Sequence, residues 1–120
     1  MHILHLEYSA FFRKIIKEMI IGSGHSPIES KYGSDLFKIL AQTDVALIIT
    51  GFELADMTGE ELIENLSTSR YSDIPVVLIT SLEVDEVRER LKGLKIQDYI
   101  LKQDLSPETF NKVIDRILED

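Results

Sequence analysis

Apolar residues along the chain follow two different spacings. Largely apolar runs at residues 3–6, 45–50 and 74–80 fit strands that are buried on both faces. Apolar positions that recur every three or four residues follow each run and fit helices with one buried face. A short stretch at 27–29 fits an edge strand, and 98–101 fits a fifth strand. The pattern therefore predicts five strands that alternate with five helices.

Capping residues mark where the predicted helices begin and end. Ser34 can cap the second helix, and Thr58 with Glu61 fits a capping box at the start of the third. Gly93 stops the fourth helix, and Ser106 followed by a proline opens the fifth. These boundaries leave short connections, as expected of a single compact domain over residues 1–120.

Strict alternation of strands and helices predicts an α/β fold with a parallel sheet covered on both faces. For this length we expect the flavodoxin-like (βα)5 arrangement, a three-layer sandwich with strand order 2-1-3-4-5. Ligands of such sheets bind beyond the carboxyl ends of the strands that flank the switch point, here the first and third. The residues at those ends are Glu7, Tyr8, Gly51, Phe52 and Glu53.

The composition narrows the possible partners. The formal net charge is −8, from 21 acidic and 13 basic residues, which disfavours direct binding to nucleic acid or to anionic membranes. The chain has no cysteine, so disulfides and thiolate chemistry are excluded. No apolar run is long enough to span a membrane, and the first residues lack a secretory pattern. We therefore expect a cytoplasmic protein.

Four segments at the strand ends carry a resemblance to a known family. They are residues 3–9 followed by Arg13, then 47–59, 76–81 and 98–102. In this order they resemble the receiver domain of bacterial two-component response regulators, and the resemblance covers essentially the whole chain. It implies signal transduction within a phosphorelay, with a partner histidine kinase as phosphoryl donor.

The chain departs from the family where the chemistry takes place. Gly51 stands where the resemblance places the phosphoacceptor aspartate, so the nucleophile is missing. Tyr8 replaces one of the two acidic residues that help to hold magnesium, and Glu7 retains the other, one methylene longer. Mg²⁺ requires near-ideal octahedral oxygen ligation, so we expect its binding to be weak or lost. Residues that match the family pattern are Thr80, Lys102 and the switch aromatic Tyr99.

Each of these residues also has a structural interpretation. Without an acceptor aspartate, Lys102 needs another anion, and Glu7 is the expected partner because buried charges are paired. Tyr8 is expected to fill the volume that the missing aspartates leave. Glu53 and Asp56 are the acidic residues near enough in sequence to serve as substitute acceptors.

Other polar positions have simpler interpretations. Thr80 and Tyr99 fit ordinary strand packing as well as a retained switch. His5 is expected to be a hydrogen-bonded histidine near the core, and no metal-ligand spacing connects it with another histidine. The fourth helix is expected to expose its charges, which fit either a solvated face or a partner surface. Those charges are Asp85, Glu86, Arg88, Glu89 and Arg90.

The leading hypothesis is a degenerate receiver domain, not an enzyme, that acts through phosphorylation-independent protein–protein interaction. Its expected partners are a histidine kinase, a tandem receiver, a fused output domain or a second copy of the chain. A homodimer would use the surface formed by the fourth helix, fifth strand and fifth helix. Two alternatives remain open: an active phosphoreceiver that uses Glu53 or Asp56, and a small-molecule-sensing domain that uses the altered pocket.

Overall fold

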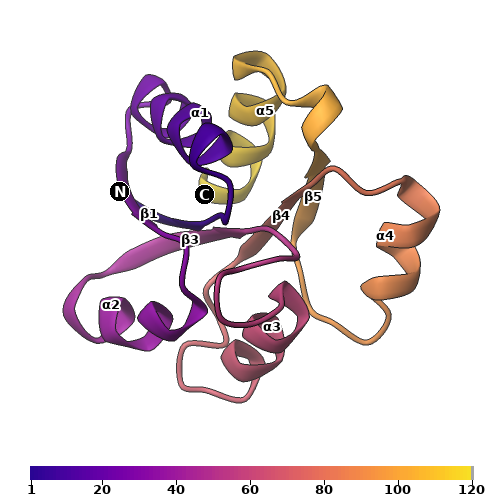
Figure 1. The fold of residues 1–120 in the computed structure, drawn as a ribbon. Helices are drawn as coiled ribbons and strands as arrows, with labels where there is room; N and C mark the ends of the chain where they lie inside the picture. Colours follow the sequence, from indigo (N-terminus) through magenta and orange to yellow (C-terminus); the bar gives the residue numbers. More distant parts are fainter. Residues whose placement is uncertain (120) are drawn as a thin grey trace.

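Five parallel strands form one sheet in the order β2-β1-β3-β4-β5, as the alternation predicts. The computed structural model describes residues 1–119, and only Asp120 of the predicted domain lies outside them. The topology is the expected flavodoxin-like one (Figure 1). The strands are β1 (His2–Leu6), β2 (Ser26–Ser30), β3 (Val45–Thr50), β4 (Val76–Thr80) and β5 (Asp98–Leu101).

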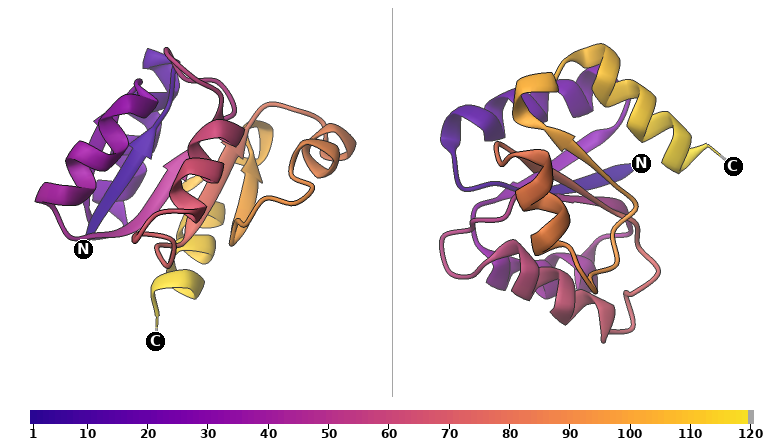
Figure 2. Two further views of the ribbon diagram at one scale, coloured as in Figure 1. Left: turned by 90° about the horizontal axis from the view of Figure 1, so that it is seen from below. Right: turned by 90° about the vertical axis from the view of Figure 1, so that its right-hand side faces the viewer.

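Helices cover both faces of the sheet. The helices α1 and α5 lie on one face and α2 and α3 on the other, while α4 stands beside β4 and β5 (Figures 1 and 2). No helix within residues 1–119 has the length and apolar character needed to cross a membrane. The helices are α1 (Ala10–Gly22), α2 (Leu36–Gln42), α3 (Gly59–Ser67), α4 (Val84–Arg90) and α5 (Pro107–Leu118).

Side-chain alternation along the central strands divides the core into two layers. Ile3 of β1 packs with residues of α1 and α5, whereas its neighbour Leu4 packs with residues of α2 and α3. The same alternation separates Leu47 from Ile48 on β3. The apolar stripe predicted on α5 faces the first layer, with Phe110 fully buried. The two layers hold the strand ends rigidly at one edge of the sheet.

Two of the predicted helix starts are confirmed by their capping contacts. The Thr58 hydroxyl accepts a hydrogen bond from the Glu61 amide at 3.2 Å, and the Ser106 hydroxyl accepts one from the Thr109 amide at 3.1 Å. The fourth helix was predicted to stop near Gly93, and α4 ends at Arg90, three residues earlier. Gly93 itself has a φ of +79°, a left-handed conformation that favours glycine.

Two predicted boundaries are wrong. Ser34 does not cap α2, because residues Gly33–Asp35 form a short 3₁₀ helix first and the Ser34 amide donates to the Asp56 carboxylate instead. The fourth strand begins at Val76 and not at residue 74. The preceding Pro75 has no N–H to contribute to the ladder, which accounts for the later start.

His5 is fully buried in β1, but the predicted hydrogen bond is absent. Neither ring nitrogen has a hydrogen-bond partner among residues 1–119, and the nearest carboxylate, Glu29, lies 3.7 Å from Nε2. Burial lowers the pKa of His5 to about 4, helped by the positive charges of Arg13 and Lys17. The imidazole is therefore neutral at pH 7.

Candidate functional site

The carboxyl ends of β1, β3 and β4 surround a pocket of about 200 Å³. The structure thus brings together the five strand-end residues that the topology singles out. It adds Thr80 and Lys102, which follow the next two strands along the sheet. The lining residues are Glu7, Tyr8, Ser9, Gly51, Phe52, Glu53, Ile79, Thr80, Ser81, Leu82, Arg90 and Lys102.

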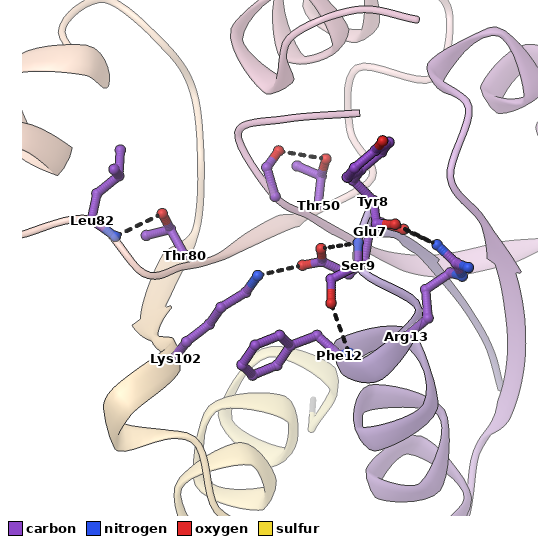
Figure 3. Close-up of polar contacts among 10 residues, drawn as sticks. Glu7, Tyr8, Ser9, Phe12, Arg13, Thr50, Thr80, Leu82 and Lys102 are labelled. Atoms are coloured by element: carbon purple, nitrogen blue, oxygen red, sulfur yellow. Dashed lines mark hydrogen bonds and ion pairs between the residues drawn. The ribbon is translucent and has the colours of Figure 1, made fainter. Parts of the chain in front are cut away.

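The predicted contact between Glu7 and Lys102 is present. Lys102 Nζ lies 3.0 Å from Glu7 Oε1, and the two side chains are only 16% and 5% exposed (Figure 3). The other carboxylate oxygen, Oε2, accepts a hydrogen bond from the Ser9 amide at 2.8 Å. Lys102 Nζ also lies 4.1 Å from the ring centroid of Phe12, a cation–π contact. Both charges are therefore satisfied within the chain.

The expectation that Tyr8 fills the emptied pocket is wrong. Its side chain is 57% exposed and points away from Lys102 (Figure 3). Consecutive residues at the end of a strand project to opposite sides, so an inward Glu7 turns Tyr8 outward. Arg13 Nη1 reinforces this by donating to the carbonyl oxygens of Glu7 and Tyr8 at 2.7 and 2.8 Å.

Gly51 is not required by the backbone. Its φ is not in the left-handed region, and a Cβ placed there would lie 3.4 Å from Glu7 Oε1 and 3.6 Å from the Ile79 carbonyl oxygen, ordinary contact distances. Gly59 differs, because a Cβ there would come within 2.2 Å of the Gly51 carbonyl oxygen. A side chain is therefore excluded at Gly59 but has room at Gly51.

Only one of the two candidate substitute acceptors reaches the pocket. Asp56 lies outside the lining and accepts hydrogen bonds from the amides of Gly33 and Ser34 at 2.7 and 3.1 Å. Hydrogen bonding from Ser34 and from the Gly33 amide lowers the pKa of Asp56. Through these bonds the carboxylate connects the loop after β3 with the segment after β2. Glu53 lines the pocket with an exposed side chain.

The residues that match the family's switch occupy the expected elements. Thr80 is buried at the end of β4, and its hydroxyl oxygen accepts a hydrogen bond from the Leu82 amide at 3.2 Å. Tyr99 of β5 is half-buried and packs against the cluster formed by Phe52, Leu78 and Val87. Both interpretations of this pair, packing and switching, are compatible with these positions.

Arg90 is a pocket residue that the sequence interpretation placed on the outer face of α4. Its Nε and Nη2 atoms donate to the two carboxylate oxygens of Glu60 at 2.7 and 2.8 Å, and its guanidinium carbon lies 4.2 Å from the Phe52 ring centroid. Hydrogen bonding to Glu60 raises the pKa of Arg90. The sequence signal that could have placed Arg90 at the pocket is its position three residues after the apolar Val87, because this spacing puts both residues on one helix face.

Comparison with curated proteins gives relatives along almost the whole chain. The two-component response regulator ORR5 of rice (Oryza sativa) is 27% identical over 119 residues, which cover 98% of this chain and 88% of that protein. The probable transcriptional regulator ycf27 of Cyanidium caldarium is also 27% identical, but the match covers 46% of its length.

Solved structures support the same fold. One is the receiver domain of a sensor histidine kinase from Pseudomonas aeruginosa PAO1, crystallised with a magnesium ion in its active-site cleft. It has a TM-score of 0.89 at 15% identity, and the match covers 99% of this chain and 98% of that domain. The chemotaxis protein CheY4 of Vibrio cholerae has a TM-score of 0.85 at 20% identity, with 98% of each chain covered.

The family profile described as "Response regulator receiver domain" matches residues 3–115. This match runs from Ile3 in β1 to Asp115 in α5. The chain therefore belongs to the response regulator receiver domain family of two-component signal transduction.

Proposed function

We propose that this receiver domain signals by phosphorylation-independent protein–protein interaction and is not an enzyme. The observation that carries the proposal is the closed ion pair between Glu7 and Lys102 beside Gly51. The lysine ammonium already has its anion, and the position that resembles the phosphoacceptor has no nucleophilic side chain.

The same geometry disfavours magnesium. Glu7 is the carboxylate that a cation would need, yet it already accepts from Lys102 and from the Ser9 amide. Tyr8 provides no carboxylate and points outward. Because Mg²⁺ requires a nearly complete octahedron of oxygen ligands, binding at this pocket is weak or lost.

The proposed partners are proteins of the same signalling systems. A histidine kinase, a tandem receiver or a fused output domain would bind the domain, and the surface of α4, β5 and α5 would serve a homodimer. The acidic net charge of −8 makes nucleic acid an unfavourable direct partner. Signalling would then depend on the presence of the partner and not on a phosphoryl group.

A second candidate function is small-molecule sensing. Tyr8 lines the pocket without filling it, and the pocket beside Gly51 has a volume of about 200 Å³. A ligand there would lie between the Glu7–Lys102 pair and the buried Thr80. Thr80 pairs with Leu101 of β5, so a ligand at this position would contact a strand next to β5.

Intact-mass spectrometry after incubation with acetyl phosphate tests the main proposal. We expect no phosphoryl increment with or without Mg²⁺, and none in Gly51→Asp, because the carboxylate that Tyr8 replaces is still missing. A Mg²⁺-dependent increment on the wild-type chain contradicts the proposal. Its loss in Glu53→Gln but not in Asp56→Asn would assign the phosphoryl group to Glu53.

A further inference from the structure

Helix α4 has little packing of its own. Val87 is its single fully buried residue, whereas each of the other four described helices buries at least two. In the left view of Figure 2, α4 lies at one side of the molecule, apart from the other helices. Its position must therefore depend on contacts besides the apolar core.

Arg90 provides such contacts from the last residue of α4. It forms a two-point ion pair with Glu60, which lies in the first turn of α3. Its guanidinium also stacks at 4.2 Å on Phe52, the residue that follows Gly51. One side chain thus joins α4, α3 and the loop after β3, and we name Arg90, Glu60 and Phe52 the α4 clamp.

The chemistry of the α4 clamp favours one fixed geometry. A guanidinium that donates two parallel hydrogen bonds to a carboxylate is restricted in angle as well as in distance. Phe52 is itself buried and packs with Leu78 and Val87, so the guanidinium rests on a ring that belongs to the core. Arg90 and Glu60 are 29% and 28% exposed, which limits but does not abolish screening by solvent.

We propose that Arg90 is a positioning residue whose contacts with Glu60 and Phe52 hold α4 against the pocket loop. The α4 surface is then presented to a partner without any phosphoryl group in the pocket. This second step rests on the proposed function, whereas the mechanical role of the clamp is measurable on the isolated chain. The interaction joins the pocket rim to the helix through contacts among the chain's own residues.

Residue-resolved amide hydrogen exchange tests the α4 clamp in Glu60→Gln and Arg90→Met. The reporters are the Val87 and Leu91 amides, whose hydrogen bonds to Glu83 and Val87 carbonyls hold α4 together. We expect these amides to exchange about fivefold to thirtyfold faster in both variants, with the strand amides unchanged. Arg90→Lys, which keeps the charge but loses the two-point geometry, should give an intermediate rate.

Two exposed neighbours provide matched controls. Glu61→Gln removes a charge from the same turn of α3, and Arg88→Met removes one from α4, yet neither residue belongs to the clamp. If Glu60→Gln exchanges like Glu61→Gln, or if every strand amide accelerates equally, the positioning role is refuted. Should Arg90→Met fail to fold, the milder Glu60→Gln decides.

The two proposals fail separately. Phosphoryl labelling of the wild-type chain by acetyl phosphate would overturn phosphorylation independence while leaving the exchange result for α4 intact. Unchanged exchange in the clamp variants would overturn the role of Arg90 while leaving the closed Glu7–Lys102 pair in place.

Discussion

Removing one charge of the Glu7–Lys102 pair should destabilise the protein more than removing both. Glu7→Gln keeps the length of the side chain but leaves the Lys102 ammonium, 16% exposed, without its carboxylate. A buried charge that loses its partner typically costs 3–5 kcal/mol. Because Lys102 retains the Phe12 ring and some contact with water, we expect a loss of about 3 kcal/mol in the free energy of unfolding, near the low end of this range.

The magnitude follows from two opposing terms. At 3.0 Å and an effective dielectric constant of about 20, the attraction between the charges is about 5.5 kcal/mol. Desolvation of the carboxylate and the ammonium offsets most of that gain, so the pair as a whole adds little to stability. The double variant Glu7→Gln with Lys102→Met should therefore lose only about 1 kcal/mol, because no unpaired charge remains.

Urea unfolding followed by far-ultraviolet circular dichroism at pH 7 measures Glu7→Gln, Lys102→Met and the double variant. Glu64→Gln, an exposed carboxylate on α3, controls for the loss of one negative charge. The reasoning is refuted if Glu7→Gln stays within about 1 kcal/mol of this control, or if the double variant loses the sum of the two single losses. Either result would mean that solvent, not Glu7, neutralises Lys102.

Gly51→Ala should leave the free energy of unfolding unchanged or raise it by about 0.5 kcal/mol, whereas Gly59→Ala should lower it by about 2 kcal/mol or more. Thermal unfolding of both variants measures this difference, and equal losses would contradict the contact distances. For His5, whose folded pKa of about 4 lies below its ordinary 6.5, the unfolded chain binds the extra proton between these values. The free energy of unfolding should therefore fall by about 3 kcal/mol between pH 6.5 and pH 4. Urea titrations at several pH values measure this pH dependence, which His5→Leu should remove. A pH dependence that persists in His5→Leu would assign it to other groups.

The fold could be predicted from the sequence because each strand carries its own signal. The apolar run at Val45–Thr50 and the capping residues Thr58 and Ser106 act locally, and the structure confirms them. The start of the second helix was predicted wrongly because the Ser34 amide donates to Asp56, which lies 22 residues away. A contact over that distance leaves no local pattern in the sequence.

The site was predictable where a missing charge partner demanded a replacement. Lys102 needed an anion, and Glu7 was the acidic side chain at the adjoining strand end. The direction of Tyr8 was not predictable from volume alone, because strand alternation and the Arg13 hydrogen bonds turn it outward. Arg90 was missed because its partner Glu60 belongs to another helix, 30 residues away.

The contrast between two glycines separates what the fold needs from what phosphorylation needs. Gly59 leaves no space for a side chain, since the Gly51 carbonyl oxygen occupies it, so the scaffold itself demands glycine there. Gly51 has an ordinary backbone, and a Cβ there would meet its neighbours at ordinary contact distances, so the backbone does not demand glycine. Under the proposed function, a glycine at this position is therefore a change in chemistry that the backbone does not impose. Beside Gly51, Glu7 and Lys102 neutralise each other, which is the arrangement that the proposed function predicts.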